Sequence, residues 1–322
     1  MNANGKTVLV LGATGGVGGE AARALLRHGW TVRALTRTLR ENDGSGIDWR
    51  QGDAMNADDV LRAAEGVAVI VHAVNPPGYR GWNRLVLPML DHTIAAARAV
   101  GARIVLPGTV YNYGDDAFPV LTEASPQHAR THKGQIRVAM EQRLADAARD
   151  GTPVLILRCG DFFGPRAANN WFTQGLVKPG QPLRTVTYPG PRQLAHSWAY
   201  LPDVGETMAR LLDRERDLAT FDAFHFEGHY ITGDELVDAI RRAANAPDLR
   251  VRAFPWPLIV LASPFVETLR ELRPMRYLWK TPLRLDGHKL HAFLDDVPHT
   301  GIDEALRATL ASMDVGIVQE RA

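Results

Sequence analysis

The sequence contains a single cysteine, Cys159, so no disulfide can form within the chain. It also lacks an excess of either charge: 37 Lys and Arg residues oppose 36 Asp and Glu residues, for a net charge of +1. A nucleic-acid-binding protein usually shows a basic excess or patch, so this balance gives no support for a nucleic-acid partner. No secretory signal is visible, and the longest apolar stretch, residues 256–266, holds two prolines and falls short of a membrane span. We therefore expect a cytoplasmic protein without a membrane partner.

Short apolar runs alternate with helical patterns over the first half of the chain. The hydrophobic fraction is 45% and the charged fraction 23%, as in ordinary globular domains. Strands that are apolar on every residue are typical of a parallel sheet covered on both faces. The alternation therefore predicts an α/β fold with a doubly wound parallel sheet. The expected strands cover residues 7–11, 31–36, 47–50, 67–71, 103–106 and 154–157, and the expected long helices cover 85–100 and 135–149.

A glycine-rich loop lies between the first expected strand and the first expected helix, with the spacing G-x-x-G-x-x-G. We expect Gly12 to permit the tight turn, Gly15 to let the backbone approach a pyrophosphate, and Gly18 to let the helix lie close to the strand. The free N–H groups of the helix N-terminus would face the phosphates. This context favours a dinucleotide-binding loop over a turn that binds nothing. Its candidate contact residues are Gly12, Thr14, Gly15, Gly16, Val17 and Gly18.

The residue after the second strand indicates which dinucleotide is bound. An NAD site places an acidic residue there, about 20 positions beyond the loop, to hold the ribose 2′-hydroxyl. Here that place is taken by Arg37, and no Asp or Glu occurs in the second strand or in the four residues after it. A guanidinium would clamp a 2′-phosphate, so Arg37, with help from Arg33 or Arg40, favours NADP over NAD. The alternative is a solvated surface arginine.

Other polar candidates leave alternatives open. Asp53 follows the third strand, where its carboxylate could meet the adenine edge or could cap the helix that begins near Asn56. Two histidine pairs have the spacing of metal ligands, but neither has an evident third ligand on a rigid element, so no metal site is predicted. These pairs are His128 with His132 and His288 with His291.

The second half of the chain has a looser pattern. Helices are expected over 200–212, 233–244 and 303–313 and a strand over 250–254, and the apolar segment 254–269 is interpreted as a buried strut rather than a lid or a dimer face. Residues 1–165 are interpreted as a dinucleotide-binding domain to which residues 195–226 return. The remainder would form a smaller, mixed substrate lobe, covering residues 166–194 and 227–322.

These residues resemble the extended and atypical short-chain dehydrogenase/reductase superfamily, the Rossmann-fold group often labelled NAD-dependent epimerase/dehydratase. The similarity covers most of the chain. It is carried by the glycine loop, Gly52-Asp53, Val71-His72-Ala73, the segment Pro107 to Gly114, Leu157-Arg158, Phe163-Gly164-Pro165, and the segment Tyr200 to Val204.

The resemblance implies a role for several further positions. Ala73 and Val74 would line the cofactor, Thr109 would hydrogen-bond the substrate oxygen, and the backbone of residues 159–162 would face the nicotinamide. Family members are often homodimers through two long helices, here 85–100 and 135–149. Aromatic and polar residues fall where the family builds its substrate pocket, although ordinary packing between lobes is an alternative. These residues are Asn170, Trp171, Arg192 and His196.

The family's catalytic Tyr-x-x-x-Lys pair is not found at its expected place. Glu141 marks a position four residues after the family's lysine, which puts Arg137 where lysine belongs and Lys133 where tyrosine belongs. Arginine stays protonated, so Arg137 would hold the cofactor rather than act as a base. The proton donor would be Lys133, if burial lowers its pKa, or a tyrosine of the neighbouring loop, Tyr111 or Tyr113. The resemblance is closest to an atypical branch with Lys-Gly-x-x-Arg here.

Two functions agree with these features. The first is an NADP(H)-dependent oxidoreductase or epimerase/dehydratase-like enzyme that acts on a small carbonyl or hydroxyl substrate with a non-standard proton donor. The second is a catalytically inactive NADP(H)-binding protein that reports redox state to a partner, an idea motivated by the missing tyrosine.

Overall fold

The computed structural model describes residues 5–38, 40, 43–76, 81–167 and 170–315. Its largest element is a sheet in which every neighbouring pair of strands is parallel. The strand order is β11 (Phe221–Phe226), β7 (Val154–Cys159), β5 (Arg103–Gly108), β4 (Val69–His72), β1 (Thr7–Leu11), β2 (Thr31–Thr36) and β3 (Asp48–Gln51). The order reverses direction between β1 and β4, which is the topological switch point where doubly wound folds bind ligands.

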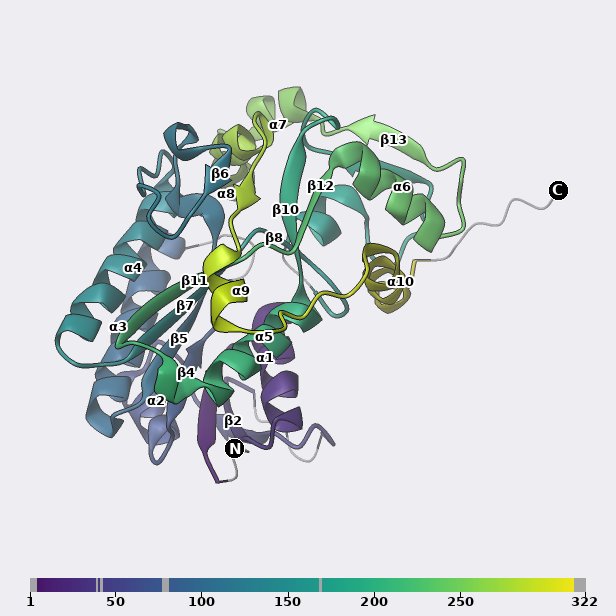
Figure 1. The fold of residues 1–322 in the computed structure, drawn as a ribbon. Coiled ribbons are helices and arrows are strands. Elements are labelled where there is room, and N and C mark those ends of the chain that lie inside the picture. Colours follow the sequence, from purple (N-terminus) through teal and green to yellow (C-terminus); the bar gives the residue numbers. More distant parts are fainter. Residues whose placement is uncertain (1–4, 39, 41–42, 77–80, 168–169, 316–322) are drawn as a thin grey trace.

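Helices cover both faces of this sheet, which confirms the doubly wound α/β fold (Figure 1). One face packs against α1 (Gly16–Arg27), α5 (Leu201–Asp213) and α9 (His288–Phe293). The other face packs against α2 (Ala57–Ala64), α3 (Trp82–Val100) and α4 (His132–Arg149). Because both faces are covered, the central strands β4, β5 and β7 are buried at every residue.

Local sequence signals set the starts of the helices beside the cleft. Asn56 caps α2, since its side chain accepts hydrogen bonds from the backbone N–H groups of Asp58 and Asp59. Thr131 caps α4 in the same way, through the backbone N–H of Gly134. The first turn of α1, in contrast, has neither a side-chain cap nor an acidic residue. Its N–H groups are therefore left for another acceptor.

The remaining strands form three small sheets, which lie above the main sheet in Figure 1 and extend to the upper right, where the second, smaller lobe lies. They join β12 (His229–Thr232), β10 (Ala195–Tyr200) and β8 (Asp161–Phe163), then β13 (Arg250–Ala253) and β9 (Thr185–Tyr188), and finally β14 (Arg284–Leu285) and β6 (Val120–Leu121). The helices of this lobe are α6 (Gly233–Ala243), α7 (Trp256–Ala262), α8 (Glu267–Leu272) and α10 (Ile302–Ser312). Its core is rich in aromatic side chains, among them Trp171, Trp198 and Trp279.

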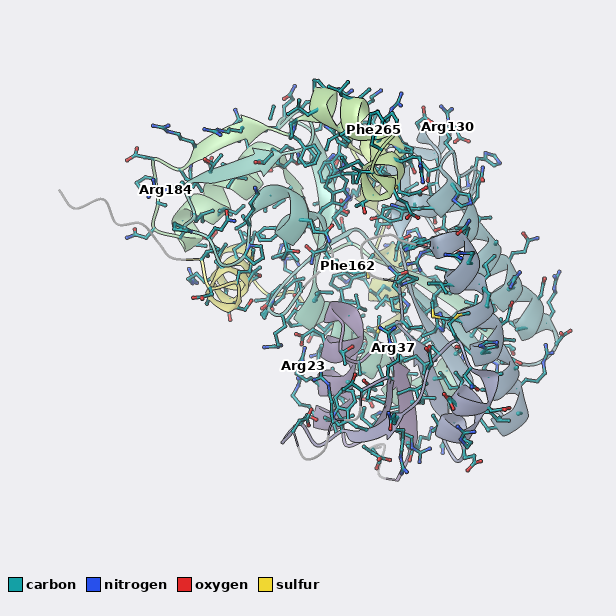
Figure 2. All side chains as sticks on the ribbon, turned by 180° about the vertical axis from the view of Figure 1, so that it is seen from behind. Arg23, Arg37, Arg130, Phe162, Arg184 and Phe265 are labelled. Carbon is teal, nitrogen blue, oxygen red and sulfur yellow. The ribbon has the colours of Figure 1, made fainter. Side chains whose placement is uncertain are left out.

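The segment 254–269 is not the buried strut that its apolar sequence suggests. Trp256 is the buried residue of α7, whereas Leu258 is 64% exposed and Leu261 is 72% exposed. Phe265, which follows α7, is 87% exposed and lies at the edge of the smaller lobe (Figure 2). No helix among the described residues is both long and apolar enough to cross a membrane.

Candidate functional site

A cleft with a volume of about 880 Å³ lies at the carboxyl ends of the parallel strands. Figure 2 shows Phe162 where the two lobes meet and Arg37 beside β2 in the larger lobe, and both residues line the cleft. Five of the six predicted residues of the glycine loop line the cleft, and the sixth, Gly18, does not. The other predicted cofactor residues that line it are Arg37, Asp53, Ala73, Val74 and Arg137, together with Thr109 and Asn170.

The glycine loop leaves no room for side chains at two positions. Gly12 has φ +91°, and a Cβ on it would lie 2.6 Å from the backbone oxygen of Ala73. A Cβ on Gly18 would lie 2.3 Å from the backbone oxygen of Gly12, which explains why Gly18 belongs to the loop without facing the cleft. The uncapped N-terminus of α1 then opens into the cleft beside Gly15 and Gly16. These residues fit a dinucleotide's diphosphate, because its oxygens would accept from the free N–H groups.

Arg37 and Arg40 line the far end of the cleft, beyond β2. The guanidinium of Arg40 lies 5.3 Å from the ring centroid of Trp49. Arg33 has a different role from the one considered above, because it bonds to Asp48 and donates to the backbone oxygens of Ala63 and Glu65. Among the described residues, Arg37 and Arg40 are thus the exposed cations that line the cleft beyond β2, where a guanidinium would hold a phosphate bidentately.

Asp53 lines the cleft and does not cap α2, since Asn56 fills that role. One carboxylate oxygen of Asp53 accepts from the backbone N–H of Met55 at 2.9 Å, and the backbone N–H of Asp53 donates to Asp59 at 2.9 Å. The carboxylate is thus fixed beside the cleft by a local turn.

His72, at the end of β4, contributes a neutral ring to the cleft. Its Nδ1 lies 2.8 Å from Thr93 Oγ1, and that hydroxyl donates to the backbone oxygen of Met89 at 3.0 Å. Because the Thr93 hydroxyl already donates its proton, Nδ1 of His72 must be protonated and donate a hydrogen bond to Thr93 Oγ1. The other ring nitrogen, Nε2, is then unprotonated and can accept a hydrogen bond. Burial, with the charge of Arg137 nearby, lowers the pKa of His72 to about 3. Among the described residues Nε2 has no hydrogen-bond partner.

The opposite end of the cleft is built from the turn after β5 and from α4. Thr109 caps the short helix Val110–Asn112, and its Oγ1 accepts from the backbone N–H of Tyr111 at 3.4 Å. Accepting that bond leaves the hydroxyl proton of Thr109 able to donate to a ligand. Arg137 lines the same end, with its guanidinium 5.1 Å from the ring centroid of Trp82.

Lys133 lies on the same face of α4 as Arg137 but does not line the cleft. It is buried, and its Nζ donates to the backbone oxygen of Glu271 at 3.3 Å. Burial lowers the pKa of Lys133 to about 8, in agreement with the expectation from sequence. The glycine at position 134 of the Lys-Gly-x-x-Arg motif is explained by a close contact, because a Cβ there would lie 2.2 Å from the backbone oxygen of Tyr111.

The two tyrosines considered as proton donors occupy different places. Tyr111 lines a small cavity next to the cleft. Tyr113 does not face the cleft: it is fully buried, and its hydroxyl lies 3.3 Å from His225 Nε2. Burial raises the pKa of Tyr113 to about 12. The Tyr113 ring packs in the core against the Arg158 guanidinium, whose Cζ lies 5.1 Å from the ring centroid.

The predicted substrate residues are not brought together. Asn170 lines the cleft, and its Oδ1 accepts from the backbone N–H of Thr173 at 2.9 Å. Trp171 is buried in the aromatic core and borders the small cavity. Arg192 and His196 do not line the cleft. Arg192 forms a surface ion pair with Asp234 at 2.9 Å, and the buried His196 ring packs at a tilt against Trp279. For these two positions the packing alternative describes the structure better.

Sequence reasoning missed three polar residues at the site. His72 and Arg166 line the cleft, and Asp161 lines the small cavity. Arg166 has φ +57° and is ion-paired with the buried Glu20 at 2.8 Å. A polar residue at the carboxyl end of a buried strand is the signal that could have identified His72 and Asp161. Among the residues that the structure describes, no group of three or more His, Cys, Asp or Glu residues could hold a metal ion.

The chain matches known proteins over most of its length. The family model "NAD dependent epimerase/dehydratase family" matches residues 8–225. A curated 3-diazoavenalumate denitrifying reductase from a Streptomyces species is 29% identical over 177 residues. That match covers 49% of this chain and 57% of the relative, so the chain aligns with little more than half of that protein's length.

Solved structures share the fold at low sequence identity. UDP-glucose 4-epimerase from Bifidobacterium longum, in complex with NAD⁺ and UDP, aligns with a TM-score of 0.72 at 16% identity, covering 95% of this chain and 98% of that one. UDP-glucuronic acid 4-epimerase from Bacillus cereus, in complex with NAD, aligns with a TM-score of 0.74 at 14% identity over the same shares of both chains. With the family match over more than half of its residues, the chain belongs to the NAD-dependent epimerase/dehydratase family.

Proposed function

We propose that the protein is an NADP(H)-dependent oxidoreductase that acts on a small carbonyl or hydroxyl substrate. The observation that carries this proposal is the layout of the cleft. Arg37 and Arg40 lie at the end beyond β2, the uncapped α1 N-terminus lies in the middle, and Thr109 and Arg137 lie at the other end. A cation beyond β2 attracts the 2′-phosphate that distinguishes NADP from NAD, whereas a carboxylate there would repel it.

The residues of the chain divide the work of binding and orientation. The bound nicotinamide would supply or accept a hydride at C4. The N–H groups of α1 hold the diphosphate, and Arg137 holds ribose or phosphate oxygens as a fixed cation. Thr109 orients the substrate by donating its hydroxyl proton to the substrate oxygen. Phe162, Leu85 and Met89 add apolar surface to the lining of the cleft.

The curated relative adds one substrate class to this proposal. Its name describes a denitrifying reductase of a diazo compound. Hydride added to an aryldiazonium cation gives the arene and dinitrogen, and no oxygen is protonated. By the resemblance, Lys133 would stand where the family has its tyrosine. Its Nζ donates to the backbone oxygen of Glu271, and the residue does not line the cleft. Such a site suits a substrate that needs no tyrosine as proton donor, so aryl diazo compounds belong in the screen beside aldehydes and ketones.

The test is a substrate screen that follows the loss of NADPH absorbance with purified wild-type protein. We expect turnover with one of these classes, and we expect Thr109→Ala to lower it by about 10- to 100-fold, since one hydrogen bond to the reacting oxygen is lost. A protein that binds NADPH tightly but turns over no member of the screen would support the redox-sensor function instead. A protein that binds neither dinucleotide would contradict both.

A further inference from the structure

Asp161 is the first residue of β8 and follows the end of β7 by two positions, on the side of the sheet where the cleft lies. It borders a small cavity of about 40 Å³ rather than the main cleft. The other polar residues that line this cavity are Thr109, Tyr111 and Asn170. A cavity of this size has room for a water molecule or for one small substituent of a ligand.

The small cavity adjoins the end of the cleft where substrate would bind. Thr109, Phe162 and Asn170 line both the cavity and the cleft. Thr109 is also the residue whose hydroxyl can donate to a substrate oxygen. A group that reaches Thr109 from the cleft therefore meets the cavity that Asp161 lines.

The carboxyl of Asp161, a residue of intermediate exposure, differs from the buried carboxyls of the protein. Glu20 pairs with Arg23 and Arg166, and Glu141 pairs with Arg158. In the described part of the chain, no hydrogen bond or ion pair reaches the side chain of Asp161. An unpaired carboxylate in such a place is costly, so the neutral acid is favoured. Burial raises the pKa of Asp161 to about 7.

A titratable neighbour of Asp161 in another sheet, Tyr188, does not neutralise this carboxyl. Tyr188 on β9 is buried, and its hydroxyl has no hydrogen-bond partner among the described residues. Burial raises the pKa of Tyr188, and negative charge on Asp161 raises it further. Tyr188 therefore stays protonated while Asp161 titrates. A carboxyl that exchanges its proton near neutral pH, next to a binding cleft, has the properties of a general acid.

We propose that Asp161 is the acid–base residue of this enzyme and protonates the substrate oxygen held by Thr109, in place of the family's tyrosine. The proposal rests on the oxidoreductase function above. In the reductive direction the carbonyl carbon gains a C–H bond from the nicotinamide hydride donor. The electron pair of the C=O π bond takes the proton of the Asp161 O–H bond, which gives an alcohol and an Asp161 carboxylate. Water that enters through the cleft returns the proton, and oxidation runs these steps in reverse.

The geometry favours Asp161 over the other candidates. Lys133 Nζ donates to the backbone oxygen of Glu271 and borders neither the cleft nor the cavity. Tyr113 faces His225 in the core. Tyr111 borders the same cavity as Asp161, so it is the competitor that the experiment must separate.

The first arm of the test needs no substrate. Infrared difference spectra of the full chain with bound NADP⁺ would follow the carbonyl stretch of a protonated carboxylic acid as the pH rises. We expect a band in wild-type protein that disappears with a midpoint near pH 7, is absent from Asp161→Asn, and persists in Asp53→Asn and Tyr111→Phe. A wild-type spectrum without that band, or a band that survives in Asp161→Asn, would overturn the proposal.

The second arm uses NADPH with p-nitrobenzaldehyde as the probe. We expect Asp161→Asn to lower kcat by at least about 100-fold. Wild-type kcat should fall as the pH rises through about 7, because the acid form is lost, and Tyr111→Phe should keep that profile. No reduction of the probe by wild-type protein, or equal rates in Asp161→Asn, would overturn the assignment.

A fluorescence titration with NADPH separates this proposal from the one on which it rests. Asp161→Asn should bind NADPH as tightly as wild-type protein, since Asp161 does not line the dinucleotide cleft. Failure of the wild-type protein to bind NADPH would defeat the proposed function itself. Intact NADPH binding together with an ionised Asp161 would defeat only the assignment of Asp161.

Discussion

Arg158 and Glu141 form a buried, bidentate ion pair beneath the turn that carries Thr109. The two N–O distances are 2.6 and 2.7 Å, and both side chains are almost fully enclosed. Arg158 also donates to the backbone oxygen of Thr109 at 3.1 Å. The pair thus ties β7 and α4 to the turn after β5 and fixes the position of Thr109 at the cleft.

Removing one partner of this pair should destabilise the protein strongly. Glu141→Ala leaves the Arg158 charge buried without its carboxylate, which should lower the free energy of unfolding by about 3–5 kcal/mol. Asp150→Ala is the matched control, because Asp150 pairs with Arg98 on the surface and should cost less than about 1 kcal/mol. Urea unfolding followed by circular dichroism measures both. Similar losses of unfolding free energy in the two variants would show that the buried ion pair stabilises the protein no more than the surface pair does.

The glycine loop should tolerate no side chain at Gly18. In Gly18→Ala the new Cβ would meet the backbone oxygen of Gly12 at 2.3 Å, so the loop must shift away from the diphosphate position. We expect NADPH binding to weaken by about 1–3 kcal/mol, roughly 5- to 150-fold in Kd. Gly301→Ala serves as control, since nothing lies within 4 Å of its Cβ position. Unchanged affinity in Gly18→Ala, measured by fluorescence titration, would contradict the loop's assigned role.

Arg37 should determine the choice between NADP(H) and NAD(H). A charged hydrogen bond to the 2′-phosphate is worth about 1.5–3 kcal/mol, so Arg37→Asp should raise the Kd of NADPH by about 10- to 100-fold. NADH has no 2′-phosphate, so its Kd should change far less. Arg37→Met separates the lost cation from the added negative charge and should fall between. An equal loss for both dinucleotides would refute the contact.

A surface histidine should make stability depend on pH. His28 Nδ1 lies 2.5 Å from Asp213 and its Nε2 lies 2.9 Å from Glu206. Burial opposes charge on the ring, but these hydrogen bonds outweigh it and raise the pKa of His28 above its usual 6.5. The stabilisation is therefore full below pH 6.5 and is lost as the pH rises through the folded-state pKa. His28→Gln should lack this dependence in thermal unfolding between pH 5.5 and 8.5, and identical slopes for both proteins would exclude the contribution.

The βα units with strong periodicity could be predicted from sequence. The bounds of β1 and β2 agree with the expected strands 7–11 and 31–36, because these runs are continuous and end at clear turn signals. The strand β11 and most strands of the small sheets were missed, although the strand expected over 250–254 matches β13. Phe221–Phe226 joins the main sheet although it includes Asp222 and His225, and Ala195–Tyr200 mixes polar and aromatic residues. Tertiary packing rather than local pattern decides such strands.

The cofactor side of the site could be predicted better than the substrate side. The glycine loop and Arg37 belong to a single βαβ unit, so their spacing alone places them together. The cavity beside Asp161 joins residues more than 50 positions apart, Thr109 and Asp161 among them, and its shape depends on packing between lobes. Packing between the lobes also explains why the prediction for Arg192 and His196 differs from the structure. The sequence suggested that they line a substrate pocket, whereas Arg192 pairs with Asp234 and His196 packs against Trp279.

Calorimetric titration of the purified, folded protein with NADPH and NADH tests the central claim most directly. If the α1 N-terminus holds a diphosphate and Arg37 holds a 2′-phosphate, NADPH should bind with measurable heat and more tightly than NADH. No heat with either dinucleotide at millimolar concentration would contradict the account.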